Sequence, residues 1–159
     1  MMKNHTIMLV VLLGMDFLVN GLSLNNLEDE KIMDFDADNV PAEKRNLLQF
    51  GKMIRCATGR SPWKYNNYGN YCGSGGSGVP VDGVDRCCQA HDRCYDNNDH
   101  CNPKWKSYNY ATAGTSPSCR ITCGGSSSND QCQTDVCECD KVAAECFARN
   151  TYNSNNKHK

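Results

Sequence analysis

The pattern of hydrophobic and polar positions predicts three helices in the later part of the chain. Apolar residues recur at spacings of three and four from Leu47 to Ile54, which is the period of one helix face. Residues 86–97 and 134–152 both lack glycine and proline, so each stretch can form an uninterrupted helix. Asp135 suits the first turn of the last helix, because a carboxylate is favoured at the positive end of the helix dipole. The pattern therefore predicts a mainly α-helical domain.

The first 45 residues follow a different pattern. Lys3 leads into an apolar run over residues 7–13, and Asp16 leaves this run too short to span a bilayer. We interpret residues 1–23 as a secretory signal peptide, which predicts that the protein is secreted and extracellular.

Residues 24–45 are strongly acidic and end in the dibasic pair Lys44-Arg45. Such a pair is a typical substrate of a trypsin-like processing protease, so we interpret this segment as an acidic pro-peptide. Asn46 is then the first residue of the mature domain, residues 46–159. The alternative is an acidic linker in which the dibasic pair occurs by accident.

The cysteine content adds disulfides to this picture. All 12 cysteines follow residue 45, in a chain of 159 residues with a net charge of −1. In a small secreted domain, disulfides stabilise the fold by roughly 2–4 kcal/mol each. Structural zinc is the alternative use of cysteine, and the secretory route disfavours it. We expect no nucleic acid among the partners.

Two cysteine pairs have the same spacing. Cys87 and Cys94 are seven residues apart, as are Cys139 and Cys146, and seven residues make two helical turns. Each pair therefore lies on one helix face. Joining Cys87 to Cys146 and Cys94 to Cys139 gives equal index sums, as antiparallel helices require. Parallel helices would fit the spacing equally well, and we expect the antiparallel arrangement.

His91 lies on the same helix face as Cys87 and Cys94. Asp140, which follows Cys139, would lie within reach of one imidazole nitrogen and leave the other for water or substrate. A histidine paired with a carboxylate is a general base. The alternative is a core histidine whose hydrogen bonds are satisfied.

Asp92 follows His91 and points about 100° around the helix, toward whichever loop packs there. The candidate loop, residues 68–80, contains five glycines, so its backbone can turn carbonyl oxygens inward. Calcium binds such carbonyls together with one or two carboxylates, and a disulfide from Cys72 to Cys88 would hold the loop against the helix. The alternative for a glycine-rich loop is a flexible linker.

Three motifs in this order resemble secreted phospholipase A2, in particular its pancreatic and elapid-like branch. Residues 68–78 resemble the calcium loop, 85–95 the catalytic helix and 137–147 the second long helix. The resemblance implies a mainly α, disulfide-rich fold with an N-terminal helix, two long antiparallel disulfide-linked helices, a calcium loop and a small β-wing. The acidic segment that ends in a basic pair resembles the zymogens of that branch.

The resemblance implies hydrolysis of the sn-2 ester of glycerophospholipids to a free fatty acid and a lysophospholipid. It also implies one catalytic Ca²⁺ and peripheral binding to a phospholipid membrane surface or micelle. The catalytic residues would be His91, Asp140, Tyr95, Tyr108 and Gly73. The calcium ligands would be Tyr71, Gly73, Gly75 and Asp92. The substrate-binding residues would be Leu47, Phe50, Ile54 and Lys104, and the candidate membrane anchors Leu48 and Trp63.

The resemblance further implies six disulfides. They are Cys56–Cys119, Cys72–Cys88, Cys87–Cys146, Cys94–Cys139, Cys101–Cys132 and Cys123–Cys137. The chain departs from the family's spacing on both sides of Cys119, which leaves the pairing of that residue open. Asn70 stands where that branch has a cysteine bridged to the C-terminal tail, and residues 153–159 contain no cysteine. We therefore expect a flexible tail.

Two other interpretations stay open. A serine nucleophile at Ser74 or Ser77 is a rival mechanism, but no nucleophile-elbow pattern surrounds either residue. The rival function is a disulfide-rich toxin or receptor-binding protein on the same scaffold, in which hydrolysis is incidental.

Overall fold

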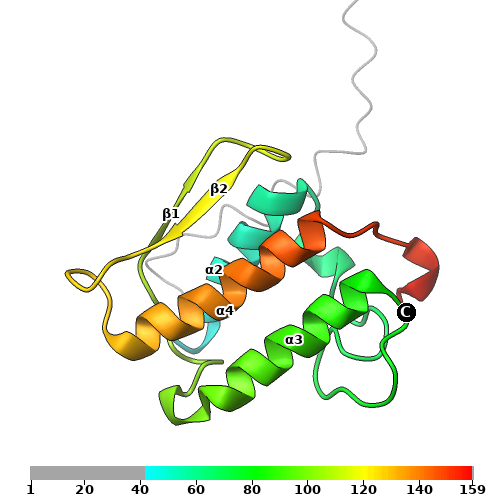
Figure 1. Ribbon diagram of the computed structural model, residues 1–159, viewed down its shortest axis with the longest axis horizontal. Helices are drawn as coiled ribbons and strands as arrows, with labels where there is room; N and C mark the ends of the chain where they lie inside the picture. Colours follow the sequence, from blue (N-terminus) through cyan, green and yellow to red (C-terminus); the bar gives the residue numbers. More distant parts are fainter. Residues whose placement is uncertain (1–41, 159) are drawn as a thin grey trace, which may run out of the picture. The chain divides into compact units, whose positions relative to one another are not determined.

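Two long helices lie side by side, and a third helix packs against them (Figure 1). The structure is a computed structural model that describes residues 42–158, with side chains from residue 46 onward. The predicted signal peptide, residues 24–41 of the acidic segment and the side chains of Lys44 and Arg45 lie outside the described residues. The elements are α2 (Ala42–Thr58), η3 (Pro62–Lys64), α3 (Gly83–Asn97), η4 (Asp99–Cys101), β1 (Tyr110–Ala113), β2 (Arg120–Cys123), α4 (Gln131–Ala148) and η5 (Ser154–Asn156).

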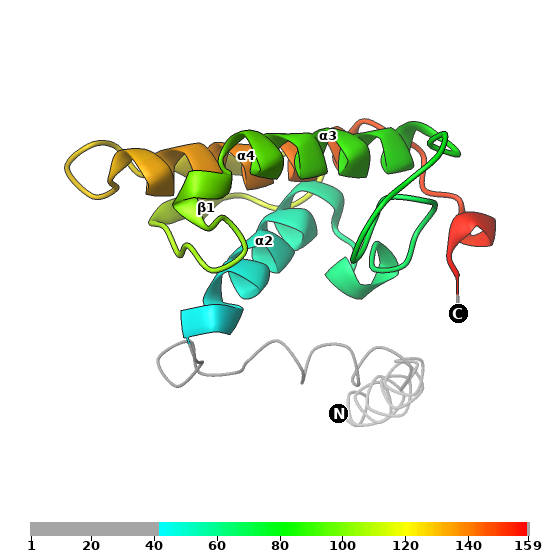
Figure 2. The same ribbon diagram turned by 90° about the horizontal axis from the view of Figure 1, so that it is seen from below.

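Helices α3 and α4 are antiparallel and joined by two disulfides. The Cα atoms are 5.8 Å apart in Cys87–Cys146 and 5.7 Å apart in Cys94–Cys139. The two disulfides have nearly equal Cα–Cα distances and lie two turns apart on each helix. They therefore keep the helices side by side over these two turns. Figures 1 and 2 show the two helices running alongside each other. The antiparallel arrangement that we expected is confirmed.

Both long helices begin earlier than the glycine and proline pattern predicted. Helix α3 begins at Gly83 instead of residue 86, because the side chain of Asp82 caps it by accepting a hydrogen bond from the Asp85 N–H. Helix α4 begins at Gln131 instead of residue 134, because Asp130 and Gln133 form a reciprocal capping box. The N-terminal position that we assigned to Asp135 is therefore wrong.

Helix α4 also ends earlier than predicted, at Ala148 instead of residue 152. The side chain of Asn150 folds back and donates a hydrogen bond to the carbonyl of Cys146 at 2.8 Å. This bond satisfies a carbonyl of the last turn and helps to end the helix.

Side chains from all three helices form the core. Met53 comes from α2, Val84 from α3, and Val136 and Phe147 from α4, and each is at least 97% buried. Strands β1 and β2 form a two-stranded antiparallel sheet with register Tyr110↔Cys123 to Ala113↔Arg120. The mainly α fold with a small β-wing is confirmed.

The six disulfides are the six that the resemblance implied, including Cys56–Cys119, and no cysteine is left free. Cys123–Cys137 ties the sheet to α4, and Cys72–Cys88 ties the glycine-rich loop to α3. Among residues 42–158, no helix is both long enough and apolar enough to cross a membrane.

The C-terminal segment differs from our expectation of a flexible tail. Residues Ser154–Asn156 form the short helix η5, and Lys157 forms a β-bridge with Tyr68. Backbone hydrogen bonds join Gly69 to Asn156 and His158 to Asn67. The absence of a cysteine predicted a free tail, but backbone and side-chain hydrogen bonds take the place of a covalent anchor.

Candidate active site

Helix α3 places His91 opposite the buried carboxylate of Asp140. The Nε2 atom of His91 is 2.7 Å from Oδ1 of Asp140, whose side chain is fully buried in α4. A carboxylate accepts hydrogen bonds only, so the imidazole carries its proton on Nε2 and exposes the lone pair of Nδ1. Nδ1 makes no hydrogen bond with any residue that the structure describes. This arrangement orients the imidazole so that Nδ1 can accept a proton.

Three further side chains surround the Asp140 carboxylate. The hydroxyl of Tyr95 donates to Oδ1 at 2.7 Å, and the hydroxyl of Tyr108 donates to Oδ2 at 2.5 Å. The Asn46 side-chain N–H donates to Oδ2 at 3.4 Å, and its amide oxygen lies 3.2 Å from the Tyr95 hydroxyl oxygen. Burial, then the charge of Asp140, raises the pKa of Tyr95 and of Tyr108. Both hydroxyls therefore stay protonated and act as donors.

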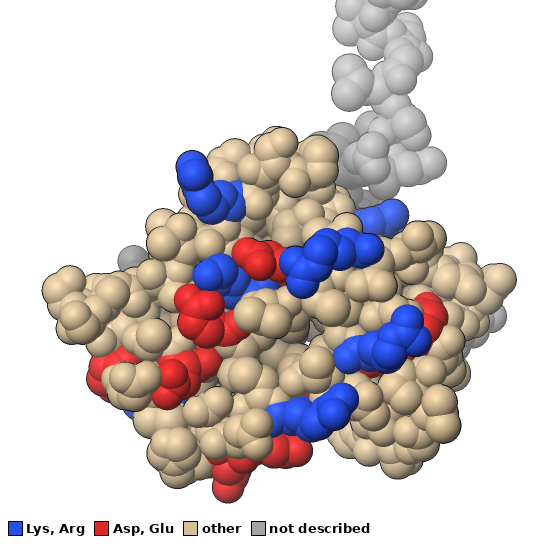
Figure 3. Space-filling view, in the orientation of Figure 1, with Lys and Arg blue, Asp and Glu red and all other residues tan. Residues whose placement is uncertain are grey.

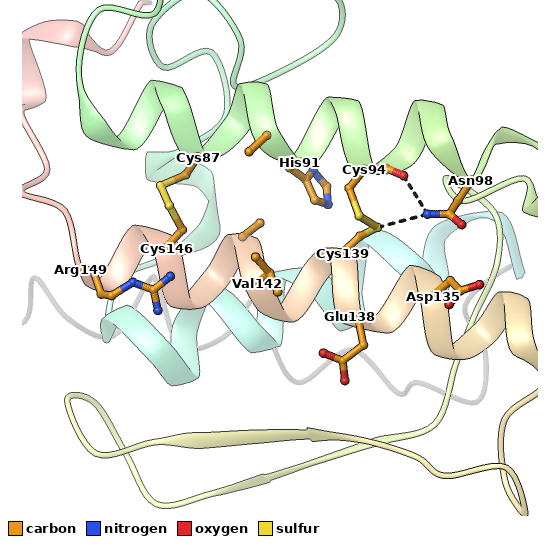
Figure 4. Close-up of a pocket in the computed structure, with 12 residues that line it drawn as sticks. Cys87, His91, Cys94, Asn98, Asp135, Glu138, Cys139, Val142, Cys146 and Arg149 are labelled. Atoms are coloured by element: carbon orange, nitrogen blue, oxygen red, sulfur yellow. Dashed lines mark hydrogen bonds between the residues drawn. A yellow bond between two sulfur atoms is a disulfide. The ribbon is translucent and has the colours of Figure 1, made fainter.

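His91 is also held by packing. Phe50 from α2 stacks on its ring with centroids 4.6 Å apart, and Tyr95 packs at 4.3 Å. Figure 4 shows His91 between Cys87–Cys146 and Cys94–Cys139, in the position that the cysteine spacing predicted. These two disulfides and His91 line a groove of about 440 Å³ between α3 and α4, with Val142 exposed at its edge. The imidazole therefore has little freedom to rotate.

Asp92 lies beneath the glycine-rich loop. A Cβ atom added to Gly76 would lie 3.3 Å from Oδ2 of Asp92 and 2.6 Å from Cδ1 of Tyr71, so the loop backbone passes close over the carboxylate. Burial raises the pKa of Asp92, although nearby His91 opposes the shift. Gly75 has φ +78, a conformation that favours glycine. Calcium binds carboxylates and backbone carbonyls, and a partly buried carboxylate beneath a glycine-rich backbone can supply both, so the residues present fit this ion.

Asp85, to which the sequence analysis gave no role, holds the ends of this loop together. Its fully buried carboxylate accepts hydrogen bonds from the backbone N–H groups of Asn70 at 2.9 Å, Tyr71 at 2.8 Å and Val81 at 2.9 Å. The first two residues lie near the start of the loop, and the third directly follows its end. The sequence did contain a signal, because Asp85 lies one turn before Cys88, the residue that is bridged to the loop.

The other predicted residues lie in different surroundings. Ile54 is buried in the core, whereas Leu47 is 68% exposed and Lys104 is exposed. Trp63 is 64% exposed and Leu48 is half-buried. Of the three residues proposed to contact acyl chains, Phe50 stacks on the ring of His91.

Comparisons with known proteins agree with this geometry. The sequence profile of the family described as phospholipase A2 matches residues 47–157. Phospholipase A2 A2-actitoxin-Ucs2a of Urticina crassicornis is 59% identical over 158 residues, which cover 99% of this chain and all of that protein. A basic phospholipase A2 of Micrurus corallinus is 44% identical over 77% of this chain and 83% of its own length. The acidic phospholipase A2 4 of Naja sagittifera is 49% identical over 70% of this chain and 86% of its own length.

A disulfide-linked helix pair that carries a histidine bonded to a buried aspartate, beside a glycine-rich loop, defines a class of hydrolase. The chain belongs to the phospholipase A2 family, and it is a phospholipase A2 enzyme.

Proposed function

We propose that the protein is a secreted, calcium-dependent phospholipase A2 that hydrolyses the sn-2 ester of glycerophospholipids to a free fatty acid and a lysophospholipid. One observation carries this proposal. His91 and Asp92 are consecutive residues of α3, and the first is bonded to buried Asp140 while the second lies under the glycine-rich loop. One turn of helix can therefore supply both a base for a water molecule and a ligand for a metal ion.

In this mechanism His91 acts as the general base. Its Nδ1 accepts a proton from the water that attacks the ester carbonyl, while Nε2–H stays bonded to Asp140. The resulting positive charge on the imidazole is stabilised by the Asp140 carboxylate, which Tyr95 and Tyr108 hold in place. The leaving alcohol takes the proton back from His91, so no covalent intermediate with the protein is required.

The proposed calcium ligands are the backbone carbonyls of Tyr71, Gly73 and Gly75 and the carboxylate of Asp92. When bound, the ion supplies a Lewis acid for the ester carbonyl and a countercharge for the phosphate. The N–H of Gly73 is proposed to donate a hydrogen bond to the developing oxyanion. In other enzymes, removing one such donor by mutation typically lowers the turnover rate by about 10²–10³-fold.

We propose that the substrate is presented by a membrane surface or a micelle to which the protein binds peripherally. Of the two candidate membrane anchors, Trp63 is 64% exposed and Leu48 is half-buried, and a tryptophan suits the headgroup layer. Lys104 is exposed and available to a substrate phosphate. Acidic and basic side chains are interspersed on the face in Figure 3, so long-range charge attraction contributes little there.

Secretion and processing are part of the proposal. Six disulfides form in an oxidising compartment, which supports a secretory route. The alignment with the Urticina crassicornis protein covers 99% of this chain, so that protein matches most of the N-terminal segment too. Cleavage after Arg45 would cut α2 near its beginning and make Asn46, which contacts Asp140, the first residue.

The alternative function is a toxin or receptor-binding protein that uses the same scaffold, and the name of the Urticina crassicornis protein favours keeping it in view. Asp92→Asn separates the two functions, with Asp99→Asn as a matched control at an exposed position. If hydrolysis is the function, Asp92→Asn abolishes both calcium binding and fatty-acid release, and any effect on cells disappears with them. A cell effect that survives in Asp92→Asn would contradict the enzymatic account.

A further inference from the structure

The C-terminal segment, residues 153–158, pairs with the backbone at the base of the glycine-rich loop, at Tyr68. Tyr68 pairs with Cys72 on one side, through N–H···O=C bonds of 3.3 and 3.2 Å, and it forms a β-bridge with Lys157 on the other side. Both views of the fold place the C-terminus beside this loop (Figures 1 and 2). The tail is thus continuous with the backbone pairing that begins the loop.

Gly69 is enclosed between this tail and helix α3. Its N–H donates to the carbonyl of Asn156 at 2.8 Å, and its own carbonyl accepts from Nε2 of His158 at 3.0 Å. On the other side, a Cβ atom at Gly69 would lie only 2.3 Å from Cγ of Asp85. Gly69 has φ +59 and contacts on both sides, so the tail restricts the room in which it can move.

One carboxylate joins the tail, the loop base and α3. Oδ2 of Asp82 accepts hydrogen bonds from the amide of Asn156 at 2.8 Å and from the hydroxyl of Tyr68, while Oδ1 caps α3 through the Asp85 N–H. The Tyr68 hydroxyl also accepts a hydrogen bond from the N–H of Asn153 at 3.2 Å. The anchor is therefore made of side chains as well as backbone.

We propose that residues 153–158 are a positioning element of the calcium loop. They hold Tyr68 and Gly69 against Asp85, so that the carbonyls that follow are already arranged before a cation binds. This inference rests on the proposed calcium site. Preorganisation lowers the entropic cost of binding, so loss of the tail should weaken calcium binding without altering the chemistry of the bound complex.

The experiment uses the secreted protein and three variants: a chain that ends at Tyr152, Asn156→Asp and the matched control Asn155→Asp. Asn156→Asp places a second carboxylate against Asp82, whereas the side chain of Asn155 is exposed and makes no hydrogen bond within the described residues. The dissociation constant for Ca²⁺ is measured by calorimetry. Hydrogen–deuterium exchange of residues 68–78 is measured without calcium.

We expect truncation to raise the calcium dissociation constant about tenfold and Asn156→Asp to raise it about fivefold, while Asn155→Asp leaves it unchanged. Hydrolysis at saturating calcium stays within about twofold of the parent protein, because residues 153–158 make no hydrogen bond to His91 or Asp140. Exchange at the loop base rises in the first two variants only.

This design distinguishes failure of the positioning role from failure of the proposed function. If the parent protein binds calcium and the truncated chain binds it equally well, the positioning role is overturned. If the parent protein binds no calcium, the proposed function fails instead. Loop exchange that is the same with and without the tail would then overturn the positioning role independently, because that measurement needs no metal.

Discussion

The histidine–aspartate couple and the glycine-rich loop are built in opposite ways. Asp140 is fully buried, with hydrogen bonds from His91, Tyr95 and Tyr108, and its helix is cross-linked to α3 on either side of the couple. Residues 73–79 of the loop are all exposed, and their backbone is fixed mainly at the base, by Asp85, by Cys72–Cys88 and by the tail.

This difference indicates that the couple controls the rate of the chemical step and that the loop controls metal affinity. The couple is rigid before any substrate arrives, so a change there should alter the rate of the chemical step. The loop depends on its base for its shape, so a change at the base should alter metal affinity and leave the rate at saturating calcium nearly intact. The predictions below test this separation.

The largest effect is expected from His91→Gln. Removing the general base should lower the hydrolysis rate by about 10²–10⁴-fold. Calcium binding should stay within about twofold, because the proposed metal ligands are untouched. His100→Gln is the matched control, since His100 is exposed and lies outside the site. Loss of calcium binding in His91→Gln would contradict the separation of the two regions.

Asp85→Asn should affect the loop alone. An amide cannot replace both carboxylate oxygens as acceptors for Asn70, Tyr71 and Val81, so the two ends of the loop separate. We expect the calcium dissociation constant to rise at least about tenfold, with near-normal turnover at saturating calcium. Calorimetry and an initial-rate titration with calcium measure the two quantities. Unchanged affinity would show that Asp85 has no role in loop geometry.

The two tyrosines should have an intermediate effect. Tyr108→Phe or Tyr95→Phe removes one hydrogen bond to a buried carboxylate, and we expect turnover to fall roughly tenfold. Tyr110→Phe is the control, because Tyr110 packs against Tyr108 and its hydroxyl has no hydrogen-bond partner among the described residues. Since burial raises the pKa of both tyrosines, neither should produce a step in the activity profile up to about pH 10. Equal effects in all three variants would indicate packing only.

The smallest effect concerns pH and the tail anchor. Partial burial acts to raise the pKa of Asp82, but hydrogen bonds from Tyr68, from the Asp85 N–H and from Asn156 outweigh it and lower the pKa below 3.8. A lowered pKa in the folded state stabilises the protein above the unfolded value, and this contribution is lost as the pH falls through the folded value.

We therefore expect the melting temperature to fall below about pH 4, and to fall less steeply in Asp82→Asn, which keeps the helix cap but has no carboxylate to protonate. Thermal unfolding of both proteins between pH 7 and pH 2 measures this difference. Parallel curves would show that Asp82 does not titrate in the way described.

The helix pairing could be predicted from the sequence because the spacing of the cysteines along the chain shows which of them share a helix face. Cys87, Cys94, Cys139 and Cys146 determine which helix faces meet, and His91 then has one possible direction. The helix boundaries could not be predicted in the same way. Side-chain caps such as those of Asp82 and Asp130 override the weak signals of glycine and proline.

The contacts that support the site were also beyond the sequence pattern. Asn46 and Asp140 are far apart in the chain, and neither periodicity nor spacing indicates that their side chains meet. The docked tail depends on backbone hydrogen bonds, which any residue type can make. The lack of a cysteine indicated a flexible tail there, whereas the backbone N–H of Asn153 and the side-chain amide of Asn156 anchor it.

The most direct test of the central claim is fatty-acid release from mixed phospholipid vesicles by the purified secreted protein, with calcium and with a chelator, and with the released chain assigned to its sn position. The account predicts release from the sn-2 position that stops when the chelator is added and returns when calcium is restored. Release that persists in chelator, or that comes equally from both positions, would contradict it.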